Sequence, residues 1–216
     1  TTIEKIEASD QFIVSLSDGN KVFTDKVMGA TGRVPNTEML GLNDVGIKIG
    51  KQGNIIVNKF NQTNIESIYA IGDVTDRINL TPIAIAEGHA FSDREFGNIN
   101  RFVSYDNVPS AVFSQPPVSV VGLTLEDTKK LDIKAKEFVS EFNPLKNTIS
   151  GKQEKTLMKL IVDENDKVLG AHMLGDYSPE IIQGIAVSIK AGAKKSDFDA
   201  TIGIHPTAAE EFVTMK

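Results

Sequence analysis

The 216-residue sequence contains no cysteine. Disulfide bonds, thiolate-rich metal sites and a thiol nucleophile supplied by this chain are therefore excluded. Basic runs are also missing, and the net charge of −6 argues against nucleic acid or an anionic membrane as a partner. No stretch approaches the roughly 18 continuous apolar residues that span a bilayer. The chain opens at Thr1 without the pattern of a signal segment, and we expect a cytoplasmic protein, with an organelle as the alternative.

Histidine is scarce as well, and the three histidines (His89, His172 and His205) lie far apart without metal-ligand spacing, so we expect no metal site. His205 is followed closely by Thr207 and Glu210. A carboxylate that orients a histidine and holds its proton serves acid–base chemistry near neutral pH. The same residues also match a capping box, in which Thr207 and Glu210 exchange hydrogen bonds at the start of a helix. The sequence leaves both interpretations open.

The first half of the chain begins with strand-like alternation. Residues 1–29 alternate as in a β-hairpin, with a turn at 17–20. Residues 27–30 are predicted to form a short buried strand that ends in a Gly- and Pro-containing turn. The apolar runs at 55–57 and 68–71 are typical of strands covered on both faces.

The second of these runs stops at Gly72 and Asp73, shortly before a predicted helix over residues 83–96. Thr81 is expected as the N-cap of this helix, with Pro82 at its first position and a glycine at its end. An aspartate can accept hydrogen bonds from ribose-like hydroxyls, and a helix N-terminus favours negative charge. We therefore predict a polar-ligand site here.

Beyond residue 106 the pattern predicts an independent α+β domain on an antiparallel sheet. A short helix is expected after Thr124, and a longer one with Ser178 as cap and Pro179 at its first position. The apolar stripe of the longer helix favours a place in the core or at a subunit contact. The strands are expected at 111–114, 118–122, 134–142, 156–162 and 168–174.

Four motifs together resemble those of the flavoprotein disulfide reductases, with the glutathione reductases as the nearest group. They are ATGRVPN at 30–36, YAIGDV at 69–74, LTP at 80–82 and HPT at 205–207 followed by a glutamate. The resemblance implies the C-terminal portion of an NADPH-dependent FAD enzyme that reduces glutathione disulfide to glutathione. Its Gly-rich fingerprints and redox-active cysteine pair would then lie upstream of this chain.

The resemblance also implies a fold and a domain order. The fold class would be α/β and α+β, with the end of the nucleotide-binding domains followed by an antiparallel-sheet dimerisation domain. Residues 1–34 would close the NADPH-binding domain and 35–106 the FAD-binding domain. Residues 107–216 would form the dimerisation domain of a homodimer.

By the same resemblance, Asp73 would bind the ribityl chain of FAD and Thr81 would face the flavin pyrimidine edge. His205, held by Glu210, would exchange a proton with the dithiol of the partner subunit. The full set of cofactor residues implied is Gly32, Gly72, Asp73, Asn79, Thr81 and Ala111, of which Gly32, Asn79 and Ala111 would contact the nicotinamide nucleotide.

The substrate assignment stays open at one position. His89 stands where many glutathione reductases carry an arginine that meets a substrate carboxylate; Arg94 could compensate, or both residues could simply face solvent. Gln115 replaces a frequent histidine, and no catalytic role is assigned to it. Trypanothione reductase and dihydrolipoamide dehydrogenase are the alternative enzymes. A non-catalytic dimerisation module is the other alternative, because the fragment alone is expected to bind FAD weakly and to be inactive.

Overall fold

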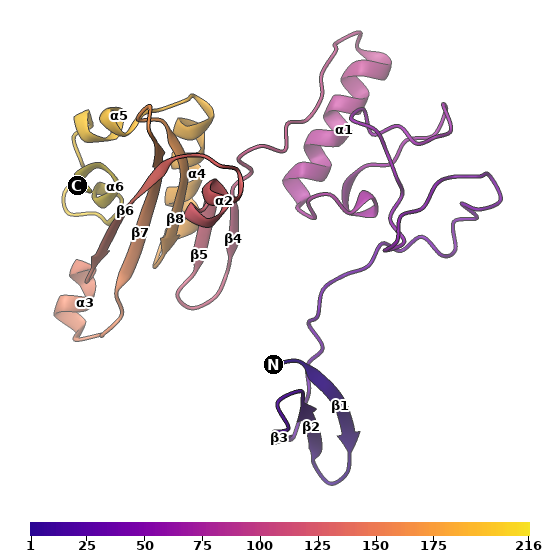
Figure 1. Ribbon diagram of the computed structural model, residues 1–216, viewed down its shortest axis with the longest axis horizontal. Helices are drawn as coiled ribbons and strands as arrows, with labels where there is room; N and C mark the ends of the chain where they lie inside the picture. The colour runs from indigo at the N-terminus through magenta and orange to yellow at the C-terminus, as the bar shows by residue number, and fades with distance from the viewer. The chain divides into compact units, whose positions relative to one another are not determined.

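The computed structural model describes residues 1–216, and the chain forms two compact units, Thr1–Val103 and Ser104–Lys216 (Figure 1). The units divide close to the boundary predicted near residue 106. The assignment of segments to particular cofactors stays a prediction. None of the helices is both long enough and apolar enough to cross a membrane.

The first unit begins with a three-stranded antiparallel sheet in the order β1-β2-β3. Its strands are β1 (Ile3–Ala8), β2 (Phe12–Leu16) and β3 (Lys21–Thr24). Gly19, at a φ of +84°, makes the tight turn between β2 and β3, and its N–H donates to the carbonyl of Leu16 at 2.9 Å. The alternation and the predicted turn at 17–20 are therefore confirmed.

The three short strands predicted at 27–30, 55–57 and 68–71 are wrong. Residues 26–37 have no regular secondary structure, and Met28 is 87% exposed. The other two segments form only isolated bridges, between Ile49 and Ile55 and between Gln62 and Tyr69. An apolar run becomes a strand only where another strand lies beside it to pair with its backbone. No strand of this chain does so here.

A 3-10 helix, η1 (Gly72–Thr75), and a long helix, α1 (Thr81–Phe96), complete the first unit. The helix ends before Gly97, as predicted, but Thr81 is not its N-cap. Leu80 occupies the N-cap and Thr81 is the first helical residue, and no side chain caps this end. A proline fits either of the first helical positions because neither N–H has a partner within the helix, so Pro82 does not define the cap.

The second unit is built on a five-stranded antiparallel sheet in the order β4-β5-β8-β7-β6. Helix α4 (Ser178–Lys190) packs across β5 and β8 (Figure 1). Ile182, Ala186 and Ile189 of this helix are buried in the main core, so its apolar stripe is a core face. The antiparallel α+β prediction is confirmed. The strands are β4 (Ser110–Val112), β5 (Val118–Gly122), β6 (Ala135–Phe142), β7 (Thr156–Asp163) and β8 (Val168–Leu174).

The remaining helices of this unit are short: α2 (Leu125–Lys130), α3 (Leu145–Ser150), α5 (Lys195–Ala200), η2 (Ala208–Glu210) and α6 (Glu211–Thr214). Thr124 caps α2, as predicted. Ser178 does not cap α4, because its hydroxyl is buried and bonds to Ser119 and to the carbonyl of Pro117. Tyr177 takes the N-cap position instead, with a positive φ of +64°.

Candidate functional site

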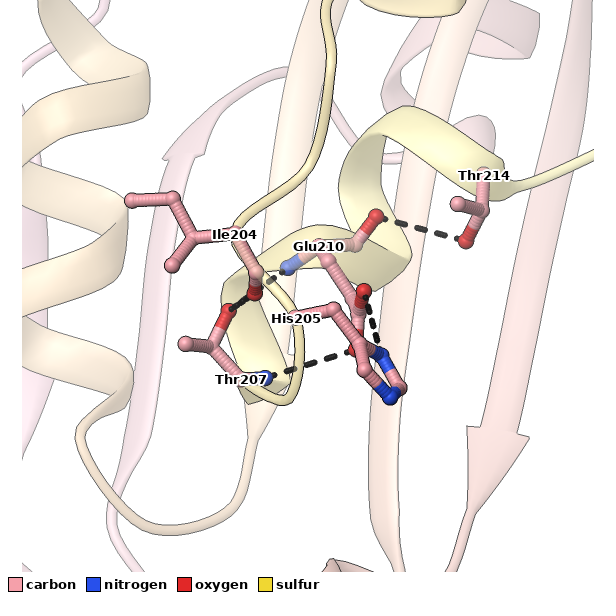
Figure 2. A network of polar contacts seen from close by, with 5 residues as sticks. All are labelled: Ile204, His205, Thr207, Glu210 and Thr214. Atoms are coloured by element: carbon pink, nitrogen blue, oxygen red, sulfur yellow. Dashed lines mark hydrogen bonds and ion pairs between the residues drawn. The ribbon is translucent and has the colours of Figure 1, made fainter.

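His205 and Glu210 form a direct pair in the second unit. The imidazole Nδ1 lies 3.0 Å from Oε1 and 3.1 Å from Oε2 of the Glu210 carboxylate. The side chain of Glu210 is only 18% exposed, whereas that of His205 is 82% exposed. Figure 2 shows the second ring nitrogen turned away from the carboxylate. The Glu210 carboxylate thus holds the ring at Nδ1, and the other ring nitrogen is left facing away from it.

The capping box is present at the same place. Thr207 precedes η2, its Oγ1 accepts from the Glu210 N–H at 3.3 Å, and the Glu210 carboxylate accepts from the Thr207 N–H at 3.3 Å (Figure 2). The Thr207 hydroxyl also donates to the carbonyl of Ile204 at 2.7 Å. The two interpretations of this motif therefore coexist, because one carboxylate accepts from both the backbone and the imidazole.

Gly203 brings the chain close enough for this pairing. A Cβ at position 203 would lie 2.8 Å from the Cβ of Glu210, a distance that real Cβ atoms do not show. Sequence reasoning missed this residue, although a glycine two positions before a histidine-proline pair is a signal of close backbone approach.

A cavity of about 580 Å³ lies beside the pair. This volume is in the range of small-molecule sites. The wall combines apolar and polar side chains from β6, α3, the start of α4 and η2, and includes both His205 and Glu210. The wall residues that sequence reasoning did not single out include Phe142, Leu145, Lys146, Asp176, Tyr177, Ile181 and Glu211.

The charged residues of this wall are partnered. Lys146 forms an ion pair with Asp176, which raises the pKa of the lysine, and its ammonium lies 5.5 Å from the centroid of the Tyr177 ring. The Glu211 carboxylate accepts from the hydroxyl of Ser140 at 2.9 Å. Lys146 could not be found from the sequence, because α3 was not predicted and the partner at 176 is far along the chain.

The first unit holds a second group of predicted residues. Asp73 and Asn79 line a cavity of about 240 Å³, together with Arg33 and the backbone turn that follows it. Asn79 donates to the Asp76 carboxylate at 3.1 Å. Thr81 is exposed at the start of α1, whose first turn lacks a side-chain cap. Carboxylate, amide and guanidinium groups thus gather near an uncapped helix start, an arrangement suited to a polar or anionic ligand.

The other predicted residues do not join these two groups. Gly32 is exposed with no atom near its Cβ position, and Ala111 lies in β4 of the second unit at a separate cavity of about 230 Å³. His89 is exposed on α1. Arg94 donates to the carbonyls of Phe60 and Arg101 and so ties two loops to the helix.

Comparison with known proteins places the chain in one family. The dimerisation domain of the pyridine nucleotide-disulphide oxidoreductases matches residues 108–216, and a second family model, described as pyridine nucleotide-disulphide oxidoreductase, matches residues 1–88. The chain is 47% identical to glutathione reductase of Nostoc over its whole length and 53% identical to the chloroplastic/mitochondrial glutathione reductase of Pisum sativum over 88% of it. It is also 47% identical to trypanothione reductase of Trypanosoma congolense over 94% of its length.

Solved structures give the same result. The HOCl-induced flavoprotein disulfide reductase RclA of Escherichia coli superposes with a TM-score of 0.87 at 27% identity, covering 99% of this chain and 50% of that one. The chain spans between about a third and a half of the length of the relatives it matches: 50% of the Nostoc protein, 35% of the pea protein and 42% of the trypanosome protein. The chain belongs to the pyridine nucleotide-disulphide oxidoreductase family.

Proposed function

We propose that this chain supplies the C-terminal half of an NADPH-dependent, FAD-containing glutathione-disulfide reductase that works as a homodimer. The observation that carries the proposal is the His205–Glu210 pair beside a cavity of about 580 Å³. The family match and the glutathione reductase relatives support the same reaction class.

His205 is the proposed proton donor and acceptor. The Glu210 carboxylate holds Nδ1, so the other ring nitrogen takes a proton from an attacking thiol and returns it to the leaving glutathione thiol. This chain has no cysteine. The dithiol is therefore assigned to the upstream half of the partner subunit, and each active site needs both subunits.

The residues around Asp73 fit a flavin nucleotide. The Asp73 carboxylate is exposed in a cavity that it shares with Asn79 and Arg33, where it can accept hydroxyl hydrogen bonds. The start of α1, which lacks a side-chain cap, would present the Thr81 N–H and a positive dipole end to the flavin ring. The flavin supplies the transfer of two electrons from NADPH to the disulfide. Gly32, Asn79 and Ala111 are the proposed nicotinamide contacts.

Glutathione disulfide is the proposed substrate, with His89 as a candidate contact, and trypanothione disulfide is the second candidate. The reason for the second is the 47% identity to a trypanothione reductase, equal to that with the Nostoc glutathione reductase. Turnover of the full-length protein with each disulfide, and with lipoamide, separates the three enzymes.

The histidine assignment is tested with His205→Gln in the full-length protein. Loss of a general acid–base group lowers turnover by about 10²–10⁴-fold, while stopped-flow reduction of the flavin by NADPH continues. His172→Gln is the matched control, because the His172 ring forms a hydrogen bond with the carbonyl of Leu123 and lies outside the cavity. Near-normal disulfide turnover by His205→Gln would contradict the assignment.

Expressing this chain with and without its upstream half tests the other parts of the proposal. The fragment alone is expected to bind FAD weakly and to be inactive, and yellow, active protein from the fragment would overturn this. The oligomeric state of the full-length protein is measured by light scattering. A monomeric enzyme with full activity would contradict the shared active site. Cytoplasmic location is part of the same proposal, and subcellular fractionation distinguishes it from an organelle.

A further inference from the structure

Glu87 is a buried carboxylate in the middle of α1. Its side chain has no exposed surface, and its Oε2 accepts a hydrogen bond from the backbone N–H of Gly72 at 2.6 Å. A charged side chain is almost never fully buried unless its polar atoms are bonded. A hydrogen bond from an amide to a carboxylate is also among the stronger ones in proteins. This contact therefore holds the backbone N–H of Gly72 in place.

Gly72 is held on both sides. It adopts a φ of +72°, and a Cβ at this position would lie 3.0 Å from the Cβ of Ala84 on α1. Its carbonyl accepts from the hydroxyl of Thr75 at 2.9 Å, inside η1. The N–H is thus bonded to α1 and the carbonyl to η1. The next residue, Asp73, lines the cavity together with Arg33 and Asn79.

We propose that Glu87 is a positioning residue for the flavin site, an inference that rests on the proposed function. Its carboxylate fixes η1, which carries Asp73, against the same helix that offers its N-terminus at Thr81. Glu87 lies six positions after Thr81 along the helix, a rise of about 9 Å. The two groups assigned to FAD are therefore set at a constant spacing by one side chain that touches neither the flavin nor the substrate.

The test compares three variants of the full-length protein. Glu87→Met fills a similar volume but offers no strong acceptor, Glu87→Gln keeps a neutral carbonyl acceptor, and Ser92→Ala on the exposed side of α1 is the control. The dissociation constant for FAD is measured by flavin fluorescence on the FAD-free protein. Hydrogen–deuterium exchange of the peptide that contains Gly72 is followed by mass spectrometry.

We expect a graded result. The FAD dissociation constant rises about tenfold or more in Glu87→Met and about threefold in Glu87→Gln, since a neutral acceptor gives roughly half the bond strength of a charged one. Exchange at Gly72 accelerates in the same order, and Ser92→Ala matches the wild type. Wild-type FAD affinity in Glu87→Met, or equal losses in the Met and Gln variants, would overturn the proposal.

Two other experimental outcomes also decide between the proposals. If Glu87→Met does not fold, Glu87→Gln decides the question, and unchanged exchange at Gly72 in that variant overturns the proposal. If the wild-type protein itself does not bind FAD, the proposed function fails. If the wild type binds FAD and the Glu87 variants bind it equally well, the proposed function stands and only the positioning role of Glu87 fails.

Discussion

Replacing Glu210 by glutamine separates two interactions that its carboxylate makes at once. The carboxylate accepts from the Thr207 N–H at 3.3 Å and lies 3.0 Å from Nδ1 of His205. Glutamine serves a capping box as glutamate does, so its carbonyl oxygen can keep the bond to Thr207. That oxygen also lies 3.0 Å from Nδ1 of His205, but glutamine replaces the second oxygen, 3.1 Å from Nδ1, by an NH₂ group and carries no charge. The cap is preserved, while the negative charge that stabilises a protonated ring is lost.

The size of the effect follows from the exposure of the two side chains. Unit charges 4 Å apart attract by about 1 kcal/mol in water and about 4 kcal/mol at an effective dielectric constant of 20. The side chain of His205 is 82% exposed and that of Glu210 only 18% exposed. We therefore take about 2 kcal/mol, between the two limits, for the attraction between the protonated ring and the carboxylate. That corresponds to a loss of about 30-fold in kcat. Glu210→Ala should in addition cost about 1 kcal/mol of stability, since the cap goes too.

The assay is steady-state reduction of glutathione disulfide by the full-length variants, with stability from urea unfolding. Glu164→Gln, in the exposed turn between β7 and β8, is the control for loss of one negative charge. We expect Glu210→Gln to keep its unfolding midpoint and lose turnover, and Glu210→Ala to lose both. Turnover near the wild-type rate in Glu210→Gln would show that the carboxylate is only a helix cap, and the reasoning would be refuted.

Two further predictions concern the second unit. Gly203→Ala places a Cβ 2.8 Å from that of Glu210, so we expect a loss of about 1–3 kcal/mol in urea unfolding and lower turnover; an unchanged midpoint and rate would show that the segment shifts freely. The second concerns pH. Hydrogen bonds from the side chain and backbone of Thr124 hold the pKa of Asp127 below its ordinary 3.8, so this carboxylate stabilises the fold above its ordinary pKa and stops doing so as pH falls through the lowered value. The advantage of wild type over Asp127→Asn in urea unfolding should therefore be complete at neutral pH and shrink below about pH 4; an advantage that grows on acidification would contradict this sign.

Short-range patterns allowed most of the second unit to be predicted. The helix after Thr124 and the alternation of the strands each depend on residues close in sequence, and both are present. Predictions failed where a distant partner was needed. Residues 27–30 are apolar but have no strand to pair with. Ser178 has a suitable side chain for a cap, yet its hydroxyl is bonded to Ser119, which is 59 positions away.

The sequence by itself placed a histidine and a carboxylate five positions apart across a capping motif, a spacing that allows their contact without requiring it. Only the tertiary structure decided that a cavity lies beside them, since its wall combines segments from 142 to 211. The same holds for Glu87, which reads as one more polar residue on a helix and becomes an anchor for Gly72 only when the chain folds back on itself. Local hydrogen bonds are encoded within a few residues, whereas burial depends on the whole fold.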